Sequence, residues 1–202
     1  MPKGQGIRRR NTSISNSFEA FLEGWLQHCH KIREEDLKDL VSRILAHYQE
    51  YYDEKSRVAQ RDIFLLFSPI WLTSLEHTFL WISSFKPSLT FQLITNSVDG
   101  LSEDQIRRID RLTQETMVKK QALNHELRSD EVLAEWKLAL GAVLANADEL
   151  RTNAVLAMVE IMRPTQSIRF LAAAAQLQLR IRTLGLQREA ETPESSGGSG
   201  SI

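Results

Sequence analysis

The chain has 202 residues, of which 42% are hydrophobic and 25% charged, and its formal net charge is −1. This composition is typical of a globular protein, and the balanced charge argues against a broad basic face that grips nucleic acid. Only 9 glycines and 5 prolines occur. They are too few for the frequent turns of a β-sandwich or barrel, so the composition predicts an all-α fold.

We expect a single helical-bundle domain at residues 17–188, with about six to eight helices and long antiparallel helices at its C-terminal end. A flexible basic arm at residues 1–16 precedes it. The tail at residues 189–202 is rich in serine and glycine, as flexible linkers are. The longest uncharged stretch, Ile63–Leu75, is too short to cross a bilayer, so no membrane span is expected.

The first predicted helix begins at Ser15 or Ser17, where a serine side chain can accept hydrogen bonds from free backbone amides. An amphipathic stripe follows at helical spacing: Phe18, Phe21, Leu22, Trp25 and Leu26. A second helix is predicted from Asp36 to about Phe67, ended by Pro69. Its apolar face carries Leu37, Leu40, Val41, Ile44, Leu45 and Tyr48.

Capping residues predict the next three helices. A capping box opens a short helix at Thr73–Ser84, because the side chains of its first and fourth residues can each bind a free amide. A proline suited to the first helical turn opens Pro87–Thr95. A second capping box opens a longer helix at Ser102–Arg128.

Apolar residues repeat with alternating steps of three and four from Leu133 to Ile161, which predicts a seam of about four heptads. The seam residues are Leu133, Trp136, Leu140, Val143, Ala147, Leu150, Ala154, Ala157 and Ile161. We expect this seam to pack within the chain, because a compact helical domain needs such a stripe. Pro164 ends this helix, and a last one is predicted at Thr165–Leu184, with Gly185 just beyond its end.

The sequence carries no recognisable catalytic or metal-binding motif. His28, Cys29 and His30 are adjacent, but consecutive helical residues point to different sides and cannot converge on one ion. Glycine-rich phosphate loops of the dinucleotide-binding or P-loop type are absent. We therefore expect no enzyme, no catalytic residue, no bound cofactor and no metal site.

The basic arm contains a run of three arginines: Arg8, Arg9 and Arg10. This run is a candidate nuclear-import or nucleic-acid patch, and a solvated arm is the alternative interpretation. The single cysteine suits a reducing compartment. We expect the protein in the nucleus, the cytoplasm or both.

Three stretches together resemble the plant delay-of-germination domain: Phe18–Leu26, His47–Ser88 and Ala147–Gly185. The specific elements are Trp71, Glu76 and Trp81 at five-residue spacing, then Lys86-Pro87-Ser88, and the sequence Ala147-Asp-Glu-Leu-Arg151. The domain occurs in seed-dormancy regulators, in the inaperturate-pollen protein and in the C-terminal half of TGACG-binding bZIP transcription factors. The resemblance covers residues 18–186 and implies an all-helical regulatory domain without enzymatic chemistry.

Relatives of this family act through protein partners, either protein phosphatases of abscisic-acid signalling or transcriptional co-regulators. The resemblance points to Phe21, Leu22, Glu23 and Trp25 as partner-binding residues. Gly24 stands where the dormancy regulator has its tryptophan, so the aromatic side chain of Trp25 is rotated by about 100° around the helix. We hypothesise that this segment enters a groove of a partner. The alternative is that it packs on the domain's own core.

Two further alternatives follow from the resemblance. A bZIP factor needs a basic region and a zipper before this domain, and only 17 residues precede Phe18, so direct DNA binding is not favoured. The alternative is a TGACG-type regulator that reaches DNA itself or through a bZIP partner. The family's dormancy regulator resembles a haem binder through two histidines whose positions are Gln178 and Arg182 here. Neither supplies an imidazole, so haem binding of that kind is not expected, and a haem or small-molecule sensor is the last alternative.

Overall fold

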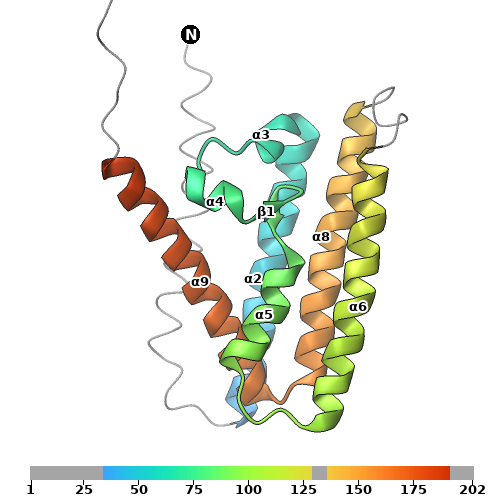
Figure 1. The fold of residues 1–202 in the computed structure, drawn as a ribbon, viewed down its shortest axis with the longest axis vertical. Helices are drawn as coiled ribbons and strands as arrows, with labels where there is room; N and C mark the ends of the chain where they lie inside the picture. The colour runs from blue at the N-terminus through green and yellow to red at the C-terminus, as the bar shows by residue number, and fades with distance from the viewer. Residues whose placement is uncertain (1–33, 129–135, 192–202) are drawn as a thin grey trace, which may run out of the picture.

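The computed structural model describes residues 34–128 and 136–191, and Figure 1 shows the arrangement of their helices. Seven helices and one two-stranded hairpin lie in these two ranges, which confirms the predicted all-α fold. In chain order the elements are α2 (Glu34–Arg61), α3 (Phe64–Phe67), α4 (Ser74–Thr78), β1 (Leu80–Trp81), β2 (Ser84–Phe85), α5 (Pro87–Ser97), α6 (Glu103–Glu126), α8 (Trp136–Ile161) and α9 (Pro164–Glu191).

The last three long helices, α6, α8 and α9, alternate in direction. In Figure 1, α6 rises and α8 descends beside it, and the two pack against each other along their length. Helix α9 rises again after α8 and so runs opposite to it, but it diverges from α8 and packs on α2, α5 and α4. None of the helices in the described ranges is long and apolar enough to cross a membrane.

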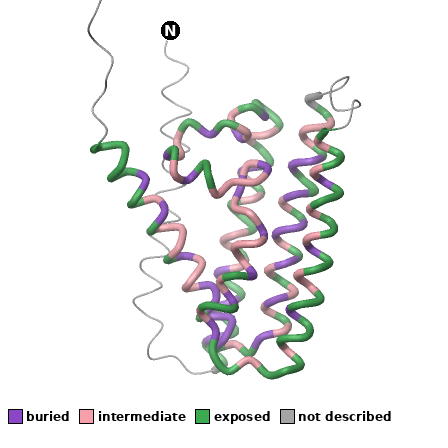
Figure 2. Tube along the Cα trace, in the orientation of Figure 1, coloured by how far each residue is buried: buried purple, intermediate pink, exposed green. Residues whose placement is uncertain are grey.

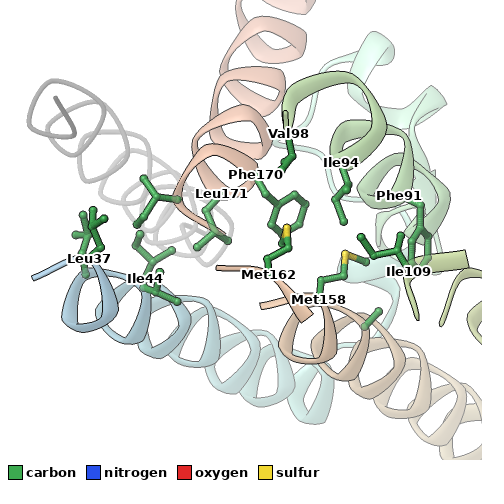
Figure 3. Packing of buried hydrophobic residues seen from close by; sticks show 14 residues of the cluster. Leu37, Ile44, Phe91, Ile94, Val98, Ile109, Met158, Met162, Phe170 and Leu171 are labelled. Carbon is green, nitrogen blue, oxygen red and sulfur yellow. The ribbon is translucent and has the colours of Figure 1, made fainter. Parts of the chain in front are cut away.

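A first core cluster joins α2, α5, α6, α8 and α9 at the lower end of the bundle in Figure 1, and Figure 3 shows its side chains converging. Its most buried members are Ile44, Ile94, Met158 and Phe170. Burying one such side chain contributes about 1.5–3 kcal/mol. The predicted apolar face of α2 is confirmed, since four of its residues are buried in this cluster and the other two pack against it.

A second cluster places the middle of the heptad seam inside the bundle. Val143, Ala147 and Leu150 of α8 are buried there together with Leu123 of α6. The buried residues of α8 form the purple stripe in Figure 2. The seam therefore packs within the chain as predicted, although Leu133 and the side chain of Trp136 lie outside the described residues.

The predicted single helix up to Phe67 is wrong, because α2 ends at Arg61 and a separate turn of helix follows. The Asp62 side chain accepts a hydrogen bond from the backbone N–H of Phe64 at 3.0 Å. An aspartate that binds a nearby amide competes with the helical backbone pattern and ends the helix. The break thus precedes Pro69, the terminator predicted from the sequence.

The capping box at Thr73 is confirmed, with both of its hydrogen bonds present, but its helix stops at Thr78 rather than near Ser84. The chain turns instead into the hairpin β1–β2, in which Trp81 pairs with Ser84. The two turn residues, Ile82 and Ser83, have φ angles of 44° and 59°. Positive φ at both central positions is the geometry of a type I′ turn, which usually contains Asn and Gly, so no local signal announced it.

The other two caps are confirmed: Pro87 occupies the first turn of α5, and Ser102 forms a capping box with Gln105. The predicted end of the last helix is wrong, since α9 continues through Gly185 to Glu191. Gly185 is buried, and a Cβ placed on it would lie 2.7 Å from the Cβ of Thr73. This glycine permits close approach of α9 to the start of α4, and it does not end the helix.

Candidate functional site

All of the residues predicted from the sequence to bind a partner or nucleic acid precede the first described residue. They are Phe21, Leu22, Glu23 and Trp25 in the predicted first helix and Arg8, Arg9 and Arg10 in the basic arm. His28, Cys29 and His30 lie outside the described residues as well. The site visible in the structure is instead built by the two sequence elements that carry the family resemblance.

Arg151 of α8, the last residue of the Ala147–Arg151 motif, binds the β1–β2 hairpin. Its guanidinium donates hydrogen bonds to the carbonyl oxygens of Trp81 (a short contact), Ile82 at 3.0 Å and Phe85 at 3.0 Å. The same group lies over the Trp81 ring, 5.0 Å from its centroid. A planar guanidinium with five donors suits a cluster of carbonyls, so Arg151 fixes the hairpin on α8.

Lys55 of α2 joins this cluster from the other side. Its ammonium donates to the carboxylate of Asp148 at 2.8 Å and to Oγ of Ser84 at 3.0 Å. Asp148 also accepts from Arg151 at 2.6 Å, so one carboxylate serves two cations. Lys55 and Arg151 are both buried. Three elements, α2, α8 and the hairpin, are therefore tied together by one buried ionic cluster.

A second buried ion pair ties α9 to α4. Arg182 donates to the carboxylate of Glu76 at 3.0 Å and to the carbonyl oxygen of Trp71 at 2.7 Å. The same carboxylate accepts from the N–H of Thr73 at 2.7 Å and from its hydroxyl at 2.8 Å. Glu76 is thus at once the capping residue of α4 and the anchor for α9.

A cavity of about 310 Å³ lies between these two ionic clusters. Its walls are α2 from Leu45 to Val58, α8 from Arg151 to Leu156, α9 from Phe170 to Arg182, and the segment from Leu66 to Phe85. We call it the α2–α9 cavity. Its lining is mainly apolar and aromatic, which is typical of a surface that receives an apolar group.

The protein around the cavity shifts the ionisation of its lining residues. Burial raises the pKa of Tyr48 to about 12 and also raises that of Tyr52, so both phenols stay neutral at physiological pH. Desolvation by burial lowers the pKa of Lys55 to about 8, assisted by the charge of Arg151 and opposed by Asp148. Lys55 therefore stays mostly protonated near pH 7, because its pKa lies only about one unit above that pH.

The cationic side chains around the cavity are occupied by structural partners. Lys55, Arg151 and Arg182 each bind a carboxylate or carbonyl of the chain itself. Gln178 also lines the cavity, so both positions compared above with a haem site lie on its wall. In the two described ranges no three His, Cys, Asp or Glu side chains are placed to hold a metal ion.

Sequence reasoning found part of this site. Both Ala147–Arg151 and the spacing of Trp71, Glu76 and Trp81 are motifs named from the sequence. The structure joins the two motifs where Arg151 binds Trp81, and Trp71, Glu76 and Arg151 all line the cavity. Lys55 was missed. A lysine in a charged helical stretch gives no sign of burial, and only its contact with Asp148, far along the chain, reveals its role.

Fold and site together define an all-helical domain whose motif residues hold its segments around an apolar cavity. A family model described as Seed dormancy control (DOG1) matches residues 20–96. Protein ZW2 of Arabidopsis thaliana is 32% identical, with 87% of this chain and 99% of that protein aligned. The chain therefore belongs to the seed dormancy control family and is a plant regulatory protein.

Two other relatives broaden the comparison. Protein RESPONSE TO ABA AND SALT 1 of Arabidopsis thaliana is 30% identical over 88% of this chain and 99% of its own length. Transcription factor TGA2.3 of Oryza sativa subsp. japonica is 27% identical over 74% of this chain, but this covers only 54% of the factor. These names describe regulators and not enzymes, and the match to part of a transcription factor fits the resemblance found in the sequence.

Proposed function

We propose that this protein is a non-enzymatic regulator that acts by binding another protein, in plant signalling or in the control of transcription. The observation that carries the proposal is the use of the motif residues. Arg151, Asp148 and Glu76 are engaged in holding α8, α9 and the hairpin together. A rigid helical scaffold of this kind suits the presentation of a binding segment, and the polar groups it engages are not free for catalysis.

The binding segment in this proposal is the amphipathic stretch before α2. Phe21, Leu22 and Trp25 supply the apolar anchors at helical spacing, and Glu23 supplies a charge beside them. Large aromatic side chains are the residues that most often dominate the free energy of protein–protein binding. The partner would be a protein phosphatase or a transcriptional co-regulator, met in the nucleus or the cytoplasm.

The process is proposed from the relatives. One relative carries abscisic acid and salt response in its name, and others are named as TGA transcription factors. Abscisic-acid signalling and regulation of transcription are accordingly the two settings in which a partner should be sought, with seed dormancy or development as the biological context.

Affinity purification with mass spectrometry from plant tissue tests this function. The wild-type chain is compared with Phe21→Ala plus Trp25→Ala, and with a matched control in which two exposed apolar residues, Val118 and Leu138, are replaced by alanine. We expect one or more partners that the control retains and the first double variant loses. Partners that bind all three chains equally would contradict the assignment of this segment.

A DNA-associated regulator of the TGACG-binding type is the second candidate, favoured by the match to TGA transcription factors. In this version Arg8, Arg9 and Arg10 contact phosphates, or a bZIP partner supplies the DNA contact. An electrophoretic shift with TGACG-containing DNA at low salt, with and without residues 1–16, decides the direct mode. A shift that is lost without residues 1–16 supports direct DNA binding through the arm. The absence of a shift with both chains excludes direct DNA binding.

A further inference from the structure

The turn of the β1–β2 hairpin contains two strained residues in a row. Ile82 and Ser83 have φ angles of 44° and 59°, although neither is glycine, asparagine or aspartate. The left-handed region crowds the Cβ of an L-residue against the backbone, and a β-branched residue there is a genuine outlier. In the two described ranges these are the only non-glycine residues with positive φ. Backbone strain is therefore concentrated at the tip of this one hairpin.

Two further features of the hairpin disfavour its docked conformation. The hydroxyl of Ser83 is buried, and it has no hydrogen-bond partner among residues 34–128 and 136–191. A hydroxyl removed from water without a partner raises the free energy of the state that buries it. The strands β1 and β2 have only two residues each, and an isolated two-stranded hairpin is at best marginally stable. The hairpin is thus not held in place by its own turn and ladder.

Contacts with other elements hold the hairpin instead. Arg151 of α8 donates to the carbonyl oxygens of Trp81 and Ile82, beside and within the strained turn. The indole N–H of Trp81 donates to Asn124 of α6 at 2.7 Å, and the Ile82 side chain is buried in the second core cluster. Strained conformations persist only where their surroundings impose them, and they are common in switch regions. The docked hairpin is therefore a balance between internal strain and external contacts.

The segments on either side of the hairpin are anchored separately from it. Before the hairpin, α4 is tied to α9 by the ion pair of Glu76 with Arg182. After the hairpin, α5 begins at the buried Pro87 and packs on α9 and α6. An opening of the hairpin can end at these two anchors and leave the bundle intact. Supersecondary motifs bounded in this way are often the units in which proteins open locally.

We propose that Leu80–Phe85 is a strained latch, which undocks from α6 and α8 as a unit while the helical bundle stays folded. Undocking releases the strain at Ile82 and Ser83 and frees the Arg151 guanidinium from the hairpin carbonyls. The latch gives the domain a second conformation, in which Trp81 leaves its seat on α6 and α8. This conformational device goes beyond the proposed function and does not depend on it.

Native-state hydrogen exchange of the full chain, followed by NMR, tests the opening. The reporter is the indole N–H of Trp81, because its hydrogen bond to Asn124 is broken only when the hairpin undocks. The reference is the backbone amide of Ala154, buried in the middle of α8. After correction for intrinsic rates, we expect the indole to exchange at least about tenfold faster, with a weaker dependence on urea, since local opening exposes less surface than global unfolding.

Substitutions at the tip test the strain. Ser83→Gly removes both the Cβ and the hydroxyl, whereas the matched control Ser83→Ala removes the hydroxyl and keeps a Cβ at positive φ. Exchange of the Trp81 indole should be about twofold to fivefold slower in the glycine variant than in the alanine variant. This factor is the relief of strain less the greater freedom that glycine gains in the open state. Thermal melting shows whether both variants are folded.

Two outcomes would overturn the proposal. Equal protection and equal urea dependence for the Trp81 indole and the α8 amide would mean that the hairpin opens only with the whole fold. Equal or faster indole exchange in Ser83→Gly, compared with Ser83→Ala, would mean that the turn stores no strain. The first comparison uses the wild-type chain alone, so it decides the opening even where a substitution unfolds the protein.

Discussion

Arg182 and Glu76, 106 residues apart in the sequence, form an ion pair of 3.0 Å that joins α9 to α4. Their side chains retain 16% and 8% exposure. The carboxylate also accepts both hydrogen bonds from Thr73, while the guanidinium binds the carbonyl of Trp71. Three polar groups of the segment from Trp71 to Thr73 therefore depend on one pair of charges.

Removal of one partner should cost much more than the pair itself contributes. Glu76→Ala leaves the Arg182 guanidinium without its carboxylate and α4 without its cap, which should lower the free energy of unfolding by about 3–5 kcal/mol. The matched control is Glu50→Ala, whose carboxylate is 76% exposed and pairs with His47; it should cost less than about 1 kcal/mol. Urea denaturation compares them, and equal losses would mean that the Glu76 pair is not structurally important.

Two glycines in helices should respond oppositely to alanine. A Cβ on Gly185 would lie 2.7 Å from the Thr73 Cβ, so Gly185→Ala must push α9 from α4 and should cost about 1–3 kcal/mol. A Cβ on Gly141 would meet only the Ile63 side chain at 4.0 Å. Gly141→Ala should therefore stabilise α8 by about 0.5–1 kcal/mol through helix propensity. Thermal melting measures both, and stabilisation by Gly185→Ala would refute the close contact.

Replacement of Arg151 should release the hairpin. Arg151→Lys keeps the charge but cannot reach the carbonyls of Trp81, Ile82 and Phe85 together, because an ammonium lacks the planar array of donors. We expect a loss of at least about 2 kcal/mol and faster hydrogen exchange at Leu80–Phe85. The control Arg169→Lys, 59% exposed beside Asp99, should change neither. Unchanged exchange in the hairpin would contradict the role of Arg151.

Lys55 should give the protein a pH-dependent stability above neutrality. Its pKa in the folded protein is about 8, below the usual 10.5, so between these values the unfolded chain binds more protons. The free energy of unfolding should then rise with pH over that window because of this residue, by about 1.4 kcal/mol per unit of pKa difference.

The comparison for this prediction is Lys55→Met, which lacks the titrating group. Between pH 8 and about 10 the stability of the wild type should increase relative to that of the variant in chemical denaturation. Above that range the raised pKa of Tyr48 works in the opposite sense in both chains, since folded phenol keeps its proton longer than unfolded phenol. Parallel pH profiles for the two chains would show that the pKa of Lys55 is not lowered in the folded protein.

Residue patterns predicted the parts of this protein that depend on near neighbours. The buried face of α2, the caps at Thr73 and Ser102 and the packed seam of α8 were read from spacings of a few residues, and the structure has them. The predictions were wrong where contacts between residues far apart in the sequence decide the local structure. Glycine is typical of a helix end, yet Gly185 lies inside α9. It is required there because a larger side chain would collide with Thr73.

The candidate site shows the same division. The motif residues Glu76, Trp81 and Arg151 were visible as a pattern, but their roles as an anchor, a hairpin partner and a donor array were not. The sequence did not indicate the role of Lys55, because this buried lysine is paired with Asp148 of another helix. A single sequence contains no direct signal for such a pair.

The sequence by itself determined that the chain is helical, where most helices begin, which faces are apolar and which family it resembles. These properties arise from helical periodicity and capping, which act over three or four residues. Only the tertiary structure decided that Arg151 and Arg182 hold distant segments around a cavity, and that the chain forms a hairpin at Ile82 and Ser83. Buried charges require partners wherever in the chain these lie, and that requirement is satisfied only when the whole bundle has assembled.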